Sequence, residues 1–262
     1  MAKEKLVVIK VGGNVIDNEQ ALSDFLALFA QIKGPKVLVH GGGKIATQLA
    51  QSLGIAQQMI DGRRVTDAET LRIVTMVYAG LINKNIVAQL QSLGTNAVGL
   101  TGADGNIIQA HKRQNASVDY GFVGDVDVVN IDLLTALIDK EMSAIIAPIT
   151  HDKNGQLLNT NADTCAQAFA EGLSQIYEVQ LIYCFEKSGV LLDVQQEDSV
   201  IEVINSSSYE NLKKEGVIFE GMLPKLNAAF QALHHGVASV AIGKWQDVSA
   251  IIQQTKGTTI IL

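Results

Sequence analysis

Short apolar runs that alternate with longer amphipathic stretches constrain the fold more than any other feature of this sequence. Seven runs have the length and the β-branched content of strands: residues 6–11, 36–40, 97–100, 142–147, 177–183, 239–242 and 258–261. Helical patterns lie between them, at residues 19–32, 44–53, 67–92, 131–140, 162–172, 207–215, 224–235 and 246–253. Several strands are apolar throughout, as in a parallel sheet that is covered on both faces. This order predicts an α/β fold with a doubly wound, mainly parallel sheet sandwiched by helices, a three-layer αβα architecture.

The sequence contains no internal repeat and no linker rich in proline, glycine and serine. At 262 residues the chain is long enough for one large α/β domain or for two lobes. The helical pattern that ends near Gly172 is followed by a new strand, and we place a boundary there. The predicted lobes cover residues 1–175 and 176–262.

Local signals predict several turns and helix starts. Asp61-Gly62 and Asn154-Gly155 are typical of hairpin turns. Residues 66–69 have the pattern of a capping box that opens the long helix, and residues 207–210 resemble another.

The composition excludes several classes of protein. Hydrophobic residues make up 47% of the chain and charged residues 18%, which is typical of a folded protein and not of a disordered one. The net charge of −7 argues against a general nucleic-acid binder, which needs a basic face. No uninterrupted apolar run reaches the roughly 18–20 residues of a membrane span, and the first residues do not resemble a secretory signal. We therefore expect a cytoplasmic protein that binds neither nucleic acid nor membrane.

The cysteines and histidines do not suggest a metal site. Cys165 and Cys184 have no ligand-like spacing, so we expect two buried thiols and no disulfide. His40 ends a strand, and we interpret it as a structural hydrogen-bonding residue rather than a general base. An acidic chain that binds an anion must supply the cations locally, through particular lysines and arginines.

Two glycine clusters follow strands directly, at residues 10–14 (Lys-Val-Gly-Gly-Asn) and 40–44 (His-Gly-Gly-Gly-Lys). Ligands bind at the carboxyl ends of strands in a doubly wound sheet, and glycine lets backbone N–H groups approach an anion closely. The alternative is a pair of tight turns with no ligand. Neither cluster is a Walker A loop or a G-x-G-x-x-G fingerprint, which argues against P-loop ATPases and nicotinamide dehydrogenases.

Two lysines lie where an anion would favour them. Lys10 closes a buried strand, where its ammonium is costly unless it reaches solvent or an anion. Lys225 follows Pro224 at a helix start, where the helix dipole disfavours a cation by about 0.3–1 kcal/mol unless an anion binds there. For both residues the alternative is a solvated lysine with no function.

Residues 159–163 (Asn-Thr-Asn-Ala-Asp) precede a helix and carry more amide and carboxylate groups than a helix cap requires. Asp163 is a candidate to hold lysine ammonium groups, and Asn159 and Asn161 are candidates to hold a substrate. Arg64 offers the bidentate fork that suits a carboxylate, although a lone arginine on a turn is usually solvated.

Five segments, in order, resemble the amino acid kinase family: residues 10–13, 40–43, 62–66, 159–163 and 221–225. Each is weak alone, but five in the same order across nearly the whole chain are specific. Within the family they are most similar to the enzymes that phosphorylate N-acetyl-L-glutamate in arginine biosynthesis.

The resemblance implies an enzyme that transfers the γ-phosphoryl group of ATP to the γ-carboxylate of N-acetyl-L-glutamate. Residues 1–175 would bind the acyl-amino acid and form a homodimer, and residues 176–262 would bind ATP. Magnesium would arrive with the nucleotide, and no protein metal site is implied. The implied catalytic residues are Lys10, Lys225 and Asp163, with Asp163 orienting both lysines. The implied substrate-binding residues are Gly42, Gly43, Arg64, Asn159 and Asn161, and those near the phosphates are Gly12, Gly13, Gly189 and Gly221.

This chain departs from the family pattern at two places. Before the Gly189-Val190-Leu191 turn, where relatives usually have Thr-Asp or Ser-Asp, it reads Tyr-Cys-Phe-Glu-Lys-Ser at residues 183–188, and it has Glu220 where they have glycine. The alternatives are therefore kinases of the same family that act on carbamate, glutamate or UMP, or a non-catalytic amino-acid sensor. The presence of both lysines and Asp163 argues against a sensor.

The resemblance leads to two further expectations. The long helix at residues 67–90 has apolar residues on several faces, and relatives dimerise there, so we expect a homodimer. Relatives that arginine inhibits carry an extra N-terminal helix, and the first predicted strand begins by Leu6, so we do not expect arginine to inhibit this protein. N-succinyl-L-glutamate is the alternative acyl substrate. It would require a second cation, such as Arg63 or Arg113. Alternation along a strand predicts that Arg63 faces solvent if Arg64 faces the substrate.

Overall fold

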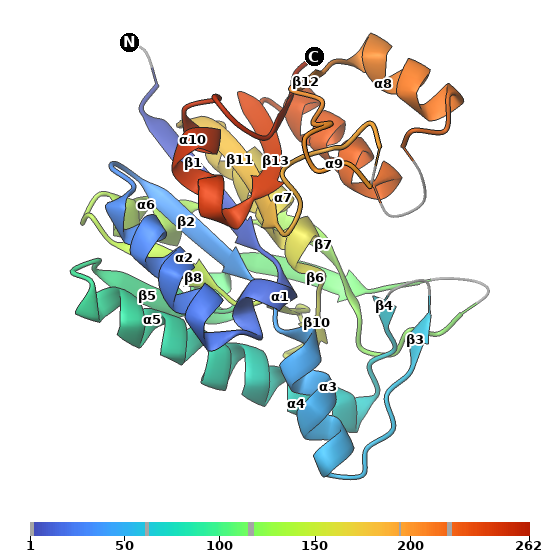
Figure 1. Cartoon of the computed structure of the whole chain (residues 1–262). Helices are drawn as coiled ribbons and strands as arrows, with labels where there is room; N and C mark the ends of the chain where they lie inside the picture. The colour runs from blue at the N-terminus through green and yellow to red at the C-terminus, as the bar shows by residue number, and fades with distance from the viewer. Residues whose placement is uncertain (1–2, 61–62, 115–117, 194, 219–221) are drawn as a thin grey trace.

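The computed structural model of the protein describes residues 3–60, 63–114, 118–193, 195–218 and 222–262. Its centre is an eight-stranded sheet in the order β12-β14-β13-β11-β1-β2-β8-β5 (Figure 1). The strands are β1 (Lys5–Val11), β2 (Lys36–His40), β5 (Ala97–Leu100), β8 (Ser143–Ile146), β11 (Glu178–Phe185), β12 (Val203–Ile204), β13 (Ser239–Lys244) and β14 (Thr258–Ile260). Only the β13–β14 pair is antiparallel. The predicted mainly parallel sheet is confirmed.

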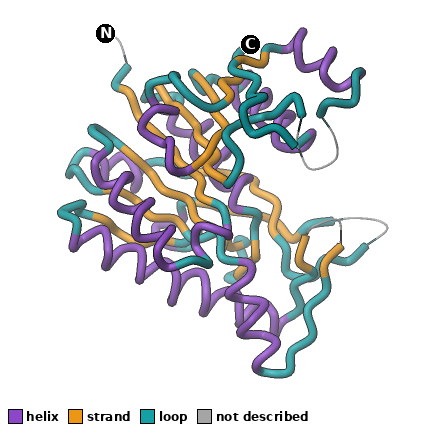
Figure 2. Tube along the Cα trace, in the orientation of Figure 1, coloured by secondary structure: helices purple, strands orange, loops and turns teal. Residues whose placement is uncertain are grey.

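Helices cover both faces of this sheet, as Figure 2 shows. Those on one face are α1 (Gly13–Ile16), α2 (Glu19–Gln31), α3 (Gly43–Ser52), α4 (Ala68–Thr75), the π-helical η1 (Met76–Ile82), α5 (Asn83–Ser92) and α10 (Val248–Ile252). Those on the other face are α6 (Asp132–Ile138), α7 (Ala162–Leu173), α8 (Ser206–Lys214) and α9 (Leu223–His234). Strand β1 serves both layers, because alternate side chains point to opposite faces: Val8 belongs to one core and Ile9 to the other. The three-layer prediction is confirmed.

A second sheet, not predicted from the sequence, has the order β10-β9-β6-β7. Its strands are β6 (Ile108–Lys112), β7 (Gly124–Val129), β9 (Ile149–His151) and β10 (Leu157–Asn159). They are short and partly polar, as in the Gly-Asp-Val-Asp-Val-Val of β7, so they lack the apolar runs that marked the main sheet. The predicted turn at Asn154-Gly155 is confirmed, since it lies between the antiparallel strands β9 and β10 and Gly155 has φ +86°.

The short strands β3 (Met59–Ile60) and β4 (Arg63–Arg64) form a separate two-stranded antiparallel sheet. The predicted turn between them, Asp61-Gly62, lies outside the described residues.

Both predicted capping boxes are displaced in the structure. The cap of α4 is Asp67 rather than Thr66, and its carboxylate accepts a 2.7 Å hydrogen bond from the Thr70 amide. The cap of α8 is Asn205, which exchanges hydrogen bonds with Ser208. Each true cap is a neighbouring Asp or Asn with extended backbone, which the sequence pattern does not distinguish from its neighbours.

The strands divide along the sheet as they divide along the sequence. The strands that follow residue 175 form one half, β12-β14-β13-β11, and the earlier strands form the other, β1-β2-β8-β5. The two halves join where β1 pairs with β11 in seven-residue register. The sheet therefore continues across the predicted boundary, and the assignment of separate ligands to residues 1–175 and 176–262 stays a prediction.

The helical stretch Ala68–Ser92 is long and apolar enough, by length and composition alone, to cross a membrane. Charged residues such as Arg72 and Lys84 interrupt this stretch, so it is not an uninterrupted apolar run. Its buried side chains, including Val74, Val77 and Ile86, belong to the core on one face of the sheet, as in the core helix of a globular fold. Met76 and Leu81 are more than half exposed on its outer side.

Candidate active site

The two glycine turns lie side by side at the carboxyl ends of two neighbouring parallel strands. Val11 at the end of β1 is in register with His40 at the end of β2. A Cβ atom on Gly41 would lie 3.7 Å from the amide nitrogen of Gly13. The sheet topology therefore brings together two turns that are almost thirty residues apart in sequence, at the edge where α/β sheets bind ligands.

The glycines differ in what their backbone N–H groups contact. Gly12 donates to the Cys184 carbonyl at 3.2 Å, so its N–H extends the sheet. In the described part of the chain, the N–H groups of Gly13, Gly42 and Gly43 donate to no protein acceptor. These three groups are available to an anionic ligand.

Position 42 requires glycine, because of its backbone conformation and because of the side chains packed against it. Its φ of +151° is one that residues with a side chain rarely adopt. A Cβ atom here would come within 2.2 Å of Ile82 Cδ1. The turn is therefore packed directly against η1.

Lys10 and Asp163 form the ion pair at the centre of the candidate site. Lys10 Nζ lies 2.7 Å from Asp163 Oδ1, and the two side chains are 15% and 27% exposed. Lys10 is the last residue but one of β1, and Asp163 is in the first turn of α7, a helix that packs on that strand. The Asp163 carboxylate, 153 positions later in the sequence, therefore compensates for the desolvation of the Lys10 ammonium.

The two asparagines before Asp163 have different contacts. Asn161 is the N-cap of α7, since its side-chain oxygen accepts from the amides of Asp163 and Thr164. Asn159 Nδ2 donates to Thr66 Oγ1 at 3.0 Å. Asn161 therefore positions Asp163, and both asparagines line a cavity described below.

Arg64 is buried rather than solvated, with 9% of its surface exposed. It donates from Nη2 to the Gly43 carbonyl and to Thr47 Oγ1, both at 2.8 Å, and from Nη1 to Gln57. The arginine ties β4 to the second glycine turn. Arg63, which alternation along the strand predicted to face solvent, is exposed but also lines both cavities described below.

Lys225 lies in the first turn of α9, and its Nζ is 5.1 Å from the centre of the Phe185 ring. Of the two lysines that Asp163 was expected to orient, the structure pairs Lys10 alone with Asp163. Among the described residues, Lys225 forms no ion pair within 4 Å.

The remaining glycines are not placed at a ligand by this structure. A Cβ atom on Gly189 would lie 2.6 Å from Thr258 Oγ1, so the glycine allows close packing against the start of β14. Gly189 lines neither of the two cavities described below. Gly221 and Glu220 lie outside the described residues.

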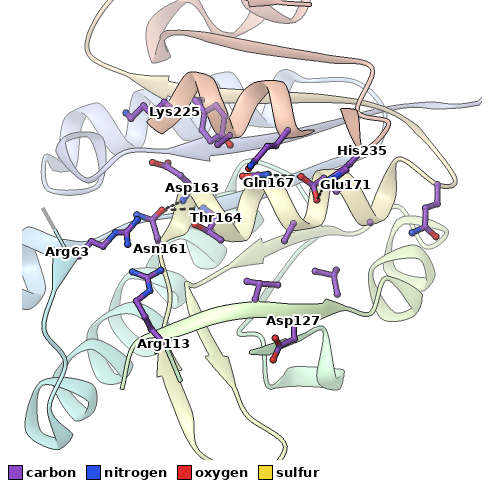
Figure 3. Close-up of a pocket in the computed structure, with 18 residues that line it drawn as sticks. Arg63, Arg113, Asp127, Asn161, Asp163, Thr164, Gln167, Glu171, Lys225 and His235 are labelled. Atoms are coloured by element: carbon purple, nitrogen blue, oxygen red, sulfur yellow. Dashed lines mark hydrogen bonds and ion pairs between the residues drawn. The ribbon is translucent and has the colours of Figure 1, made fainter. Parts of the chain in front are cut away.

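Two cavities meet at the start of α7. The larger, of about 720 Å³, runs between α7, α9 and β7, with Asp163 and Lys225 toward one end and His235 toward the other (Figure 3). The smaller, of about 230 Å³, is lined by the second glycine turn, Arg64 and Asn159. Residues that line both cavities are Arg63, Arg113 and Asn161.

Several residues near the site were not singled out from the sequence. Arg113, named only as a possible second cation, donates from Nε and Nη2 to Asp125, and these hydrogen bonds hold the pKa of Asp125 below its ordinary value. Asn14 donates to Glu186 and accepts from Lys44, which connects both glycine turns to the end of β11. The only feature of the sequence that could have indicated a role for Asn14 is its position directly after the Gly12-Gly13 pair.

Three buried groups near the site, Cys165, Cys184 and Tyr183, are held in their neutral forms. Burial raises the pKa of Cys165 and of Cys184 to about 12, so both stay thiols, as expected. Burial and the carboxylates of Asp163 and Glu171 raise the pKa of Tyr183. In the described residues, no group of three or more His, Cys, Asp or Glu side chains is arranged to hold a metal.

Comparison with known proteins places this arrangement in a family. The model of the amino acid kinase family matches residues 5–244. Acetylglutamate kinase of Cytophaga hutchinsonii is 54% identical over 261 residues, which cover 98% of this chain and 99% of that protein. The solved structure of smu.665 from Streptococcus mutans has a TM-score of 0.76 at 27% identity, over 97% of this chain and 98% of that one.

A carbamate kinase from Giardia lamblia, solved with AMP-PNP bound, has a TM-score of 0.69 at 16% identity and covers 100% of this chain and 99% of its own. At that identity the likeness is one of fold alone. The family model and the relative from Cytophaga both span almost the whole chain, and the lysine–aspartate pair and the glycine turns lie where the five sequence segments predicted them. The chain belongs to the amino acid kinase family.

Proposed function

We propose that this chain transfers the γ-phosphoryl group of ATP to the γ-carboxylate of N-acetyl-L-glutamate, as a step of arginine biosynthesis. The full-length relative at 54% identity, an acetylglutamate kinase, supports this choice of acceptor. The observation that carries the proposal is the first turn of α7. Asn161 lines both cavities, and Asp163, two residues later, holds Lys10 at 2.7 Å.

In the reaction, an oxygen of the γ-carboxylate attacks the γ-phosphorus, and the bond from that phosphorus to the β,γ-bridging oxygen breaks, which releases ADP. The carboxylate is ionised at neutral pH, so no general base is needed. Catalysis then consists mainly of positioning and of stabilising the charge on the phosphoryl oxygens. Lys10 would stabilise the transferring group and Lys225 the leaving ADP.

The acyl-amino acid would occupy the smaller cavity. A carboxylate of this substrate would meet the N–H groups of Gly42 and Gly43 and the Arg64 guanidinium, and Asn159 also lines the cavity. Gly13 would present its N–H to the phosphates. Magnesium would enter with ATP, bound chiefly by phosphate oxygens, and would neutralise part of their charge.

An ATP-dependent hydroxamate assay over a panel of acceptors tests the proposal, because hydroxylamine traps an acyl phosphate and so identifies the acceptor. The panel contains N-acetyl-L-glutamate, glutamate, aspartate and carbamate, and ADP release is followed with UMP. We expect turnover with N-acetyl-L-glutamate. Turnover with another member of the panel instead would assign a different kinase of the family, and ligand binding without turnover would indicate a sensor.

Arg64→Ala is expected to raise KM for the acyl-amino acid by roughly ten- to a hundredfold, because a charged hydrogen-bond donor contributes about 1.5–3 kcal/mol. KM for ATP should change little, since Arg64 lies in the smaller cavity. Steady-state kinetics with each substrate varied in turn measures both constants. Arg72→Ala, an exposed arginine on α4, is the matched control. An equal rise in both KM values would contradict the assignment of Arg64.

N-succinyl-L-glutamate is a second candidate acceptor, and one observation favours it. Arg63 and Arg113 both line the smaller cavity, although Arg63 was expected to face solvent. Asp125 pairs with Arg113 and neutralises one of the two charges, so one positive charge is available to a succinyl carboxylate. Without such a partner a buried carboxylate is costly.

We expect the acetyl substrate to be preferred, and the ratio of kcat/KM values for the two acyl substrates measures the preference. A succinyl preference of tenfold or more would contradict this and would assign Arg63 to the succinyl carboxylate. Arg63→Ala then has a specific consequence: it should reduce kcat/KM for the succinyl substrate and leave that for the acetyl substrate nearly unchanged.

The proposed assembly is a homodimer, formed in the cytoplasm through the outer side of the Ala68–Ser92 helix. Met76 and Leu81 expose 53% and 52% of their surface there, and Gly80 between them is also exposed. Light scattering should give twice the 28.0 kDa chain mass. Leu81→Glu should give a monomer, whereas Leu53→Glu, at a similarly exposed residue after α3, should not. A wild-type monomer, or a dimer unaffected by Leu81→Glu, would contradict this interface.

A further inference from the structure

A fully buried polar cluster lies beneath the second glycine turn. It consists of His40 and Asn83, which are 0% and 1% exposed. His40 Nδ1 is 2.9 Å from the Gly41 carbonyl, and its Nε2 is 3.1 Å from Asn83 Nδ2. Asn83 Nδ2 also donates to the Ile145 carbonyl at 2.9 Å, and Asn83 Oδ1 accepts from Lys84 Nζ at 3.0 Å. None of these groups is used by the reaction described above.

The partners determine where each proton lies. The Ile145 carbonyl can only accept and the Lys84 ammonium can only donate, so the Asn83 amide has one possible orientation. Its N–H then faces His40 Nε2, which must be unprotonated. His40 Nδ1 carries the proton and donates it to the Gly41 carbonyl. Burial and the nearby Lys84 ammonium lower the pKa of His40 to about 4, so the ring is neutral at physiological pH.

The π-helical segment η1 brings this cluster to the turn. An i→i+5 turn inside a longer α-helix shifts the residues that follow it, and such segments frequently occur at functional sites. Here η1 ends at Ile82, directly before Asn83, and both residues are buried toward the glycine turn. Two glycines leave the necessary space: a Cβ atom on Gly42 would lie 2.2 Å from Ile82 Cδ1, and one on Gly99 would lie 1.9 Å from Asn83 Oδ1.

We propose that His40, oriented by Asn83, is a positioning residue that fixes the Gly41–Gly42 peptide for binding of the acyl-amino acid. In a trans peptide the carbonyl and the following N–H point in opposite directions. With the Gly41 carbonyl held against His40, the Gly42 N–H is directed away from the imidazole, and Gly42 lines the smaller cavity. This inference rests on the proposed function, because it assigns the N–H to a substrate carboxylate.

Two variants of His40 separate a positioning role from simple core packing. In His40→Asn the amide N–H can take the place of Nδ1–H and bond the Gly41 carbonyl. In His40→Gln the longer side chain reaches the position of Nε2 and can keep the contact with Asn83. If His40 is a positioning residue, His40→Gln should raise KM for the acyl-amino acid roughly tenfold or more, as a displaced binding group does. His40→Asn should stay within about threefold of wild type, and KM for ATP should be unchanged in both.

Equal KM values for the acyl-amino acid in the two variants, with only the melting temperature changed, would show that His40 is a packing residue. The wild-type protein provides a test that does not depend on a variant folding. The ¹⁵N chemical shifts of its labelled imidazole should show a neutral ring protonated at Nδ1 throughout pH 6–8. Protonation at Nε2, or titration in that range, would overturn the proposal.

These outcomes are distinct from a failure of the proposed function. If wild-type protein phosphorylates no acyl-amino acid, the proposed function fails at once. The KM comparison is then made with the acceptor that the hydroxamate panel identifies, while the imidazole measurement stands unchanged. If that acceptor also shows equal KM values in the two variants, the positioning role is wrong whatever the substrate.

Discussion

Replacing Lys10 with alanine is expected to lower kcat by about 10²–10³-fold, the range for removing one preorganised charge-stabilising donor. The Lys10 ammonium is fixed by Asp163 at 2.7 Å and is mostly shielded from water. It therefore needs no reorganisation when negative charge shifts onto the transferring phosphoryl oxygens. KM values should change less than kcat, because this interaction strengthens as the transition state is approached.

Lys5→Ala is the matched control for this prediction. Lys5 begins the same strand, but it is exposed at the opposite end of the sheet from the glycine turns. Its removal should leave kcat within about twofold of wild type, as for a solvated surface lysine. A Lys10→Ala enzyme with near-normal kcat would mean that another cation stabilises the phosphoryl group. Thermal unfolding of both variants shows whether a loss of activity is a loss of fold.

Lys225→Ala is expected to lower kcat by a similar factor of about 10²–10³. Its ammonium lies in the first turn of α9, where the helix dipole disfavours a cation and an anion would compensate. It has the aromatic ring of Phe185 as a neighbour, and unlike Lys10 it has no carboxylate partner in the described part of the chain. Its charge is therefore available to the leaving ADP without first breaking an ion pair.

The two lysine variants should differ in their stability. Lys10→Ala leaves the Asp163 carboxylate without its ion-pair partner, so that variant should unfold at a lower temperature than wild type. Lys225→Ala should unfold close to the wild-type temperature. Lys213→Ala, on the exposed side of α8, controls for the loss of a positive charge in the same part of the chain. If Lys225→Ala raised KM for ATP with kcat unchanged, Lys225 would bind the nucleotide without stabilising the transition state.

Much of the fold was predictable because its signals are local. The run at residues 36–40 contains three β-branched or apolar residues in a row, so its pattern alone marked β2 to the residue. The other six predicted strands match strands of the main sheet to within two residues at either end, whereas the two-residue strand β12 was not predicted. The glycine turns were predicted because glycine directly after a buried strand is itself a local pattern. The mainly parallel arrangement of the main sheet follows from the alternation of strands and helices, since parallel neighbours need crossover connections.

The same reasoning did not predict the elements and side-chain positions that depend on contacts between residues distant in the sequence. The strands β6, β7, β9 and β10 are short and partly polar, and only their mutual pairing makes them a sheet. Nothing near Arg64 in the sequence indicates that it is buried against the carbonyl of Gly43, and the hydrophobic pattern of the long helix does not reveal a π-helical segment.

The sequence by itself therefore determined the layered α/β architecture, the family and the residue types of the candidate site, because hydrophobic periodicity and glycine placement act within a few residues of the chain. Only the tertiary structure decided which of those residues meet. Lys10 pairs with Asp163 and Lys225 does not, because α7 packs on β1 while α9 begins beside Phe185. Side-chain partners separated by a hundred residues are selected by packing, and packing is a property of the whole folded chain rather than of any segment in it.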